Sequence, residues 1–241
     1  MTRSELFLAS IEAMRSGHPN WELFEPDAEA AWPKNRAELW EDGYLEFLIG
    51  EANAAAGGAP AMAAGIEKER AAWEALPTLA EAQWSSDEVV GELEMRTLIT
   101  AWDLRDDVDW QIPENLLEAL ELTEEMGLKD GEVAFLMDIG SGSTTGGITI
   151  GRLQPDGEVR ITHCDGEEWY ALEVEPLRFY QTALESMGSR GWQLLFAHED
   201  RYAAARGPRF QTMLEKLSAL TPEQERPTLR AAVHDWTERT L

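Results

Sequence analysis

The sequence predicts an α+β fold in which a central antiparallel meander lies between a helical N-terminal segment and C-terminal helices. Three observations support this prediction. Apolar residues recur at helical spacing in the first and last thirds of the chain, they alternate with polar residues in the middle, and short turns join the alternating segments. The predicted strands cover residues 133–139, 147–153, 158–163 and 168–174.

The first 110 residues have the pattern of a helical segment. A capping-box pattern opens it, because Thr2 is followed three residues later by Glu5, and Gly17 ends the first helix. The same pattern recurs at Ser85 and Glu88 and predicts a helix that begins there. The later helices of this segment are predicted over residues 35–51, 66–76 and 85–100.

The middle of the chain changes from a helical period to a period of two. Residues 113–126 predict one more helix, and the alternating segments follow it. Pro155-Asp156-Gly157 and Asp165-Gly166 are turn sequences, because proline fixes φ and glycine accepts a positive φ. Strands joined by such short turns pair antiparallel, so the sequence predicts a meander of about four strands.

Helices return after the meander. Pro176 opens a helix that extends to Met187, and Thr221-Pro222-Glu223-Gln224 is typical of a helix start. The chain therefore divides into a helical segment, an α+β meander core and a C-terminal helical extension, which are also compatible with one compact domain. These three parts cover residues 1–110, 111–188 and 189–241.

The composition indicates an acidic protein of the cytoplasm. The chain carries 46 acidic and 20 basic residues, a formal net charge of −26. A field of this sign repels nucleic acid and attracts basic proteins. No apolar run is long enough to span a membrane, and no signal peptide is recognisable, so no membrane association is expected. The single cysteine, Cys164, fits a reducing compartment.

A glycine-rich segment at the end of the first predicted strand has the sequence Asp138-Ile139-Gly140-Ser141-Gly142-Ser143-Thr144, and it resembles the first phosphate loop of the actin, sugar-kinase and Hsp70 superfamily. Its acidic side chain would orient metal-bound water, and its glycines and hydroxyl groups would let backbone amides approach a phosphate. Only about a hundred residues follow, and they hold no second phosphate loop. Nucleotide or phosphate binding is therefore the alternative function. Its residues would be Asp138, Gly140, Ser141, Gly142, Ser143 and Thr144.

No catalytic or metal-binding motif emerges elsewhere. His163 and Cys164 are adjacent, so on a strand they would point to opposite faces and could not easily share one metal ion. The acidic neighbours Asp165 and Glu167 would raise the pKa of Cys164 and reduce its reactivity. The sequence therefore predicts no catalytic residue, no metal ligand and no cofactor, and it favours a protein that is not an enzyme.

The order of motifs around the meander is similar to a known family. A Pro-Glu-x-Leu helix begins at Pro113, a Phe-Leu-x-x-Ile-Gly strand covers 135–140, and a His-x-Asp-Gly-Glu-x-Trp motif covers 163–169. Together with the closing helix, residues 111–187 resemble the SUKH superfamily of cell-wall regulators and bacterial immunity proteins. The resemblance implies an α+β fold that acts by binding other proteins, in bacteria typically by neutralising a toxin, often a nuclease.

The leading functional hypothesis is an acidic immunity or antitoxin-like protein that binds and occludes a basic partner, such as a toxin or nuclease. Electrostatic attraction would speed the association and weaken as salt screens it. An uncharacterised structural or assembly factor is a third alternative, and the sequence leaves the oligomeric state open. The predicted partner-binding residues cluster at the second hairpin: Asp165, Glu167, Glu168, Trp169 and Tyr170.

Overall fold

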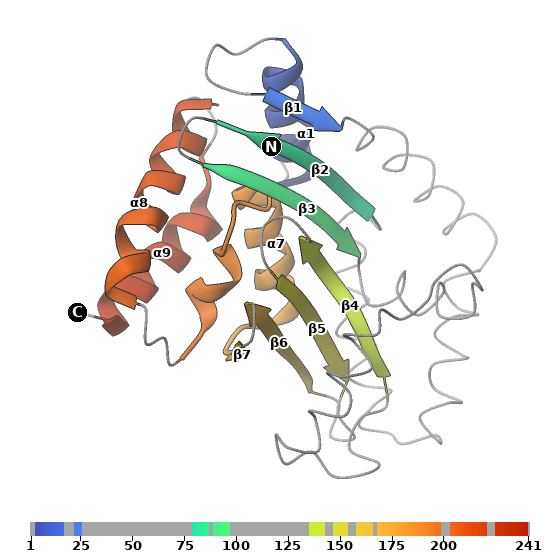
Figure 1. Cartoon of the computed structure of the whole chain (residues 1–241), viewed down its shortest axis with the longest axis vertical. Helices are drawn as coiled ribbons and strands as arrows, with labels where there is room; N and C mark the ends of the chain where they lie inside the picture. The colour runs from blue at the N-terminus through green and yellow to red at the C-terminus, as the bar shows by residue number, and fades with distance from the viewer. Residues whose placement is uncertain are drawn as a thin grey trace, which may run out of the picture.

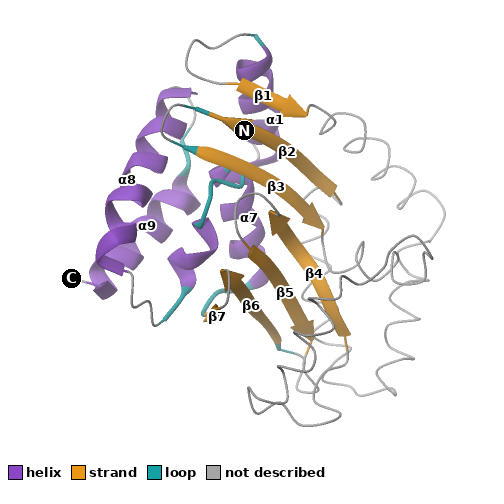
Figure 2. Ribbon diagram, in the orientation of Figure 1, coloured by secondary structure: helices purple, strands orange, loops and turns teal. Residues whose placement is uncertain are grey.

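The structure is a computed structural model that describes residues 3–16, 22–25, 79–86, 89–96, 135–142, 147–153, 158–165, 168–198, 203–220 and 225–240. Its strands form one sheet, and its helices gather on one face of that sheet (Figures 1 and 2). The described helices are α1 (Arg3–Arg15), α7 (Pro176–Ser186), the 3₁₀ helix η1 (Trp192–Phe196), α8 (Ala203–Leu220) and α9 (Pro227–Thr240). The strands are β1 (Glu22–Glu25), β2 (Leu79–Ser85), β3 (Val90–Arg96), β4 (Phe135–Gly142), β5 (Gly147–Leu153), β6 (Val159–Asp165) and β7 (Glu168–Leu172).

The sheet is an antiparallel meander in which the described strands follow one another in chain order from β1 to β7. The α+β class is confirmed, and the four predicted strands correspond to β4 to β7, with shifted ends. The predicted number of about four strands is wrong, because the described part of the sheet has seven.

The three additional strands come from the segment predicted to be helical. β1 and β2 have no predicted counterpart, and the helix predicted over residues 85–100 is wrong, because β3 occupies its middle. The cap-like sequence instead makes a tight turn, in which the Ser86 backbone N–H donates to the Val89 carbonyl at 2.7 Å. Val89 and Leu93, which both contact the core, are four residues apart. That spacing fits a helical face and also one face of a strand, so it could not distinguish them.

The sheet also crosses the segment boundary predicted near residue 110. β3 lies before that boundary and β4 after it, and the two strands pair directly through Glu94 and Ser141. Residues on both sides of the boundary therefore belong to the same sheet. The helices predicted over residues 35–51, 66–76 and 113–126 lie outside the described residues.

Two of the predicted helices are confirmed, and the last helix begins after its predicted start. α1 and α7 lie where the sequence predicts them. The predicted helix start at Thr221–Gln224 lies outside the described residues, and α9 begins at Pro227, after the non-helical residues Glu225 and Arg226. Pro227 suits the first helical position because its missing N–H would have no partner there. α8 and α9 pack against each other at the left of Figure 1.

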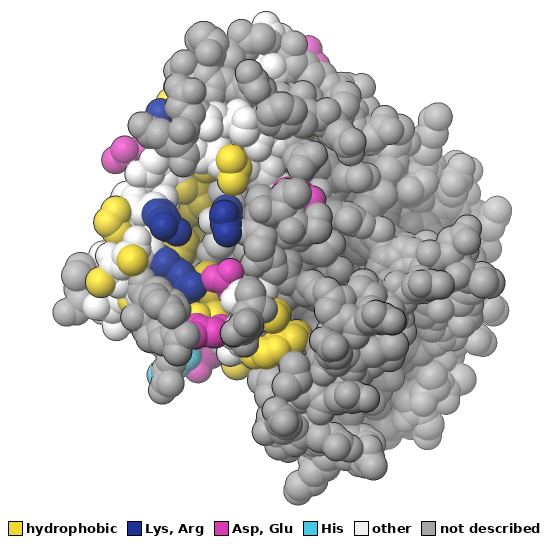
Figure 3. All heavy atoms as spheres, in the orientation of Figure 1, with side chains coloured by type: hydrophobic (Ala, Val, Ile, Leu, Met, Phe, Trp, Pro, Cys, Tyr) yellow, Lys and Arg dark blue, Asp and Glu magenta, His cyan; other side chains and the backbone are white. Residues whose placement is uncertain are grey.

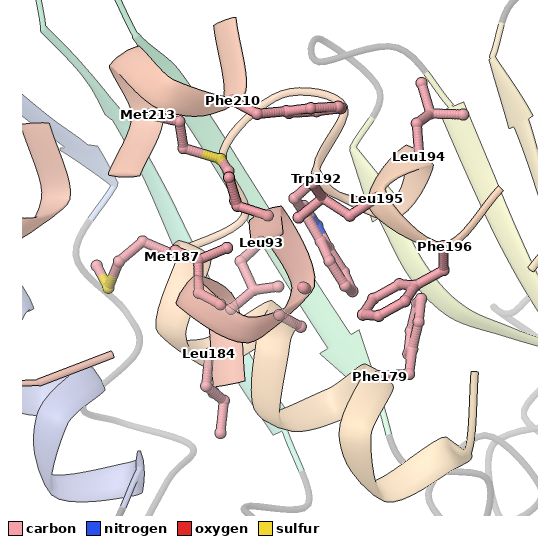
Figure 4. Close-up of a cluster of buried hydrophobic side chains, with 14 of the residues drawn as sticks. Leu93, Phe179, Leu184, Met187, Trp192, Leu194, Leu195, Phe196, Phe210 and Met213 are labelled. Atoms are coloured by element: carbon pink, nitrogen blue, oxygen red, sulfur yellow. The ribbon is translucent and has the colours of Figure 1, made fainter. Parts of the chain in front are cut away.

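The hydrophobic core lies between the sheet and the helices. Side chains of α7 and η1 make its centre, where Phe179 packs against Trp192 with ring centroids 4.6 Å apart. Phe210 and Met213 of α8 extend the cluster, and Leu93 contributes to it from β3 (Figure 4). Burying such large apolar side chains is the main favourable contribution to folding.

The end of α7 is joined closely to β3. Met187 and Gly188 both have positive φ values, 55° and 66°, which end the helix in a left-handed conformation. The Gly188 carbonyl then accepts a hydrogen bond from the Glu92 N–H at 3.0 Å. A Cβ atom at Gly188 would overlap the Glu92 carbonyl group, so both the φ value and the close approach require glycine.

A buried charged network connects four helices. Arg226, 1% exposed, donates to the Leu217 carbonyl at 3.3 Å, to the Ser10 hydroxyl at 2.9 Å and to the Glu185 carbonyl. The fully buried Glu185 carboxylate accepts a hydrogen bond from the Leu229 N–H at 2.9 Å, in the first turn of α9. Burial lowers the pKa of Arg226 to about 10, and the charge of Glu185 opposes that effect. The network therefore joins α1, α7, α8 and α9.

Charge is distributed unevenly between the two parts of the chain. Residues 176–241, which include α7 to α9, carry only 8 of the 46 acidic residues but 9 of the 20 basic ones. Figure 3 shows basic and acidic side chains side by side over the described helical side. The acidic excess of the whole chain therefore lies in residues 1–175. Of the helices that the structure describes, none has the length and apolarity to cross a membrane.

Candidate functional site

Polar side chains gather where β5, β6 and β7 face the helices. Thr149 pairs with His163, and His163 pairs with Tyr170 on the next strand. Residues directly opposite each other in antiparallel strands lie on the same face of the sheet, so these three form a row across it. Asp165 pairs with Glu168, and this pair lies on the same face, since each residue is two positions from a member of the His163–Tyr170 pair. The β6–β7 hairpin therefore presents two carboxylates and a phenol toward the helical layer.

The buried end of this row is a hydrogen-bonded pair. Thr149 Oγ1 and His163 Nδ1 are 2.9 Å apart, and the two residues are 0% and 2% exposed. A hydroxyl next to an imidazole has the composition of a nucleophile and its base, but a nucleophile must be reached by its substrate. With both residues buried, the contact accounts for polar groups in the core and does not form an accessible catalytic pair.

The open end of the row contains an arginine from α8. Arg206 Nη2 lies 2.8 Å from Asp165 Oδ2, with side chains that are 13% and 31% exposed. The guanidinium carbon of Arg206 lies 5.5 Å from the centre of the Tyr170 ring. The Tyr170 hydroxyl donates a hydrogen bond of 2.5 Å to Glu168 Oε2. We call these four residues, Asp165, Glu168, Tyr170 and Arg206, the hairpin cluster.

The structure brings together some of the predicted partner-binding residues and separates others. Asp165, Glu168 and Tyr170 belong to the hairpin cluster. Trp169 is half-buried and lies on the opposite face, where it pairs with Cys164. Glu167 lies outside the described residues. The five residues therefore do not form one surface, since Trp169 points away from the cluster.

Arg206 is the member of the cluster that the sequence did not identify. It lies 41 residues after Asp165 and on another element. No motif or spacing connects two residues at that distance, and a single arginine in a helix has no distinguishing signal. Only the packing of α8 against the hairpin shows the contact.

Cys164 lies next to this cluster but on the other face of β6. Burial and the nearby Asp165 carboxylate raise the pKa of its thiol, with burial the larger cause. Asp165 was expected to raise this pKa, and the role of burial was not anticipated. The prediction that His163 and Cys164 face opposite sides is confirmed, because His163 pairs with Tyr170 and Cys164 with Trp169. Among the described residues, no three His, Cys, Asp or Glu side chains are grouped to hold a metal ion.

The described part of the segment predicted as a phosphate loop belongs to a strand. Asp138, Gly140, Ser141 and Gly142 belong to β4, which pairs antiparallel with β5. The register shifts between Asp138 and Gly140, which indicates a β-bulge there. The last two residues predicted for phosphate binding, Ser143 and Thr144, lie outside the described residues.

Comparison of the chain with protein families, with curated proteins and with solved structures finds no match. The SUKH resemblance therefore stays a prediction.

Proposed function

We propose that this chain is a non-enzymatic, acidic, SUKH-like protein that binds a basic protein partner in the cytoplasm and acts as an immunity or antitoxin-like factor. The observation that carries the proposal is the uneven charge distribution. Residues 1–175 hold 38 acidic and 11 basic residues, whereas the helical part after them is close to neutral. Such an asymmetry orients a basic partner toward the acidic part as the two approach.

The hairpin cluster is the proposed contact region because it combines charge with an aromatic ring. Carboxylates bind guanidinium and ammonium groups through charge-assisted hydrogen bonds, and an aromatic face adds a cation–π contact. Asp165 and Glu168, which are partly exposed, supply the carboxylates, and Tyr170, which is 7% exposed, supplies the ring behind them. A toxin or nuclease that binds nucleic acid carries a basic surface, and this proposed function would occlude it.

A pull-down from lysate of the source organism, read by mass spectrometry, tests the proposal. We expect a stoichiometric basic protein that is captured at low salt and released as salt increases. The variant Glu167→Lys/Glu168→Lys should lose this partner. The matched control, Glu215→Lys/Glu238→Lys, makes the same charge change at exposed positions of α8 and α9 and should retain it.

Two results would contradict this function. Equal capture by both double variants would remove the hairpin as the contact region. A rise in melting temperature with magnesium and ATP or ADP, without a captured protein, would favour the phosphate-binding alternative, because a ligand of the folded state stabilises it by mass action.

A further inference from the structure

We propose that Arg206 is an autoinhibitory contact, which occupies within the chain the place that an arginine of the partner would take. This inference rests on the function proposed above, because it concerns the regulation of the same hairpin. In the state described here, α8 would mask the carboxylate that the partner needs, and binding would require the partner to displace Arg206.

The contacts of Arg206 are those by which proteins recognise arginine. Its guanidinium pairs with the Asp165 carboxylate at 2.8 Å, and its carbon lies 5.5 Å from the centre of the Tyr170 ring. The hydrogen bond from Tyr170 to Glu168 fixes the phenol that carries this ring. A planar guanidinium can pair with a carboxylate and stack on a ring at once, which the ammonium of lysine cannot.

The position of Arg206 in α8 gives no separate reason for a positive charge. α8 begins at Ala203, so Arg206 lies in the first turn, and no acidic residue accompanies it there. The N-terminus of a helix carries a partial positive charge, which makes a cation in the first turn unfavourable. The contact with the Asp165 carboxylate opposes this unfavourable effect of the helix dipole.

The two members of the ion pair differ in their exposure to solvent. Asp165 and Arg206 keep 31% and 13% of their side-chain surface in contact with solvent. Asp165 is the more accessible member of the pair, so an external guanidinium would approach its carboxylate first and then displace Arg206. Arg226 is the contrasting case in the same chain, since it is 1% exposed and bonded to groups on three other elements.

The test measures binding of a labelled hexa-arginine peptide to the full chain by fluorescence anisotropy at low salt. Arg206→Met removes the internal guanidinium but keeps a long apolar side chain. The matched control is Arg209→Met, which removes the same charge at an exposed position of the same helix. We expect Arg206→Met to bind about fivefold more tightly than Arg209→Met, as expected when a weak internal competitor is lost.

Two further variants complete the design. Asp165→Asn added to Arg206→Met should abolish the gain in affinity for the peptide. It removes the carboxylate that both Arg206 and an arginine of the peptide would use. Arg206→Lys keeps the charge and loses the planar fork, and it should show an intermediate gain. If Arg206→Met does not fold by circular dichroism, the comparison between Arg206→Lys and wild type decides the question.

The outcomes separate the inference from the proposed function. If Arg206→Met and Arg209→Met bind equally, while Asp165→Asn weakens binding, the hairpin binds arginine but Arg206 does not mask it, and this inference is overturned. If Asp165→Asn changes nothing in any background, the hairpin is not the contact region, and the proposed function fails with it. A gain of the same size with a hexa-lysine peptide would overturn the assignment of an arginine site.

Discussion

Replacing Arg226 by methionine tests whether the buried network holds the four helices together. Methionine fills much of the same volume, but it takes a donor away from the Glu185 carbonyl and a positive charge away from the vicinity of the buried Glu185 carboxylate. It also removes the donor from the Leu217 carbonyl and the Ser10 hydroxyl. Leaving a buried acceptor without its donor costs about 1–3 kcal/mol, so for the three acceptors together we expect the free energy of unfolding to fall by about 4 kcal/mol.

Urea denaturation followed by circular dichroism measures this change. With an m-value of about 2.5 kcal/mol/M, the expected loss lowers the urea midpoint by about 1.6 M. Arg230→Met is the matched control, since it makes the same replacement at an exposed position of α9, and surface substitutions of this kind change stability by about 0.5 kcal/mol or less.

A double variant separates the charge from the packing. Glu185→Gln/Arg226→Met removes both charges, so it should recover part of the stability that Arg226→Met loses. A loss below about 1 kcal/mol for Arg226→Met alone would refute the reasoning, because three buried acceptors that lose a common donor should lower the stability by more than that. Equal losses for the single and double variants would show that hydrogen bonds and volume, not charge pairing, carry the effect.

Three further predictions concern other parts of the chain. Gly188→Ala should lower the free energy of unfolding by about 2 kcal/mol or more, because alanine is strained at this positive φ and meets a strand carbonyl; a urea midpoint like that of wild type would contradict this packing. The hydrogen bond from Arg178 lowers the pKa of Asp235, so the pair should stabilise the fold above the unfolded pKa of about 3.9 and lose that effect as the pH falls through the lower folded value. Asp235→Asn should therefore cost about 0.5 kcal/mol at pH 6 and nothing at pH 2 in urea titrations, and equal curves at pH 6 would exclude the contribution. Burial and Asp165 raise the pKa of Cys164, so iodoacetamide at pH 8 should alkylate it more slowly than free glutathione, and an equal rate would contradict the assigned environment.

The sequence predicted those elements whose patterns have a single interpretation. β5 and the first half of β6 alternate between apolar and polar or small residues, and turn residues follow both strands, so their positions were recognisable. β2 alternates alanine with charged or polar residues and one tryptophan, which is a weak signal for a strand. β3 was taken for a helix because its core residues are four apart, a spacing that both structures allow.

The sequence likewise predicted only part of the candidate site. The hairpin residues were found because charge, aromatic residues and a turn lie next to one another in sequence. The contribution of Arg206 comes from an element 41 residues away, so only tertiary packing reveals it. Arg226 was also missed, because a charged residue in a sequence is expected on the surface unless its partners are known.

The order of the elements along the chain has a consequence for biosynthesis. All seven described strands precede residue 173, whereas the described helices on the core face of the sheet, apart from α1, belong to the last 66 residues. At a translation rate of about 5–20 residues per second, those last residues take about 3–13 s to synthesise. During that interval the nascent sheet would have an uncovered apolar face, a state prone to aggregation. Folding in the cell should therefore depend on chaperones that shield this face until α7 to α9 emerge from the ribosome.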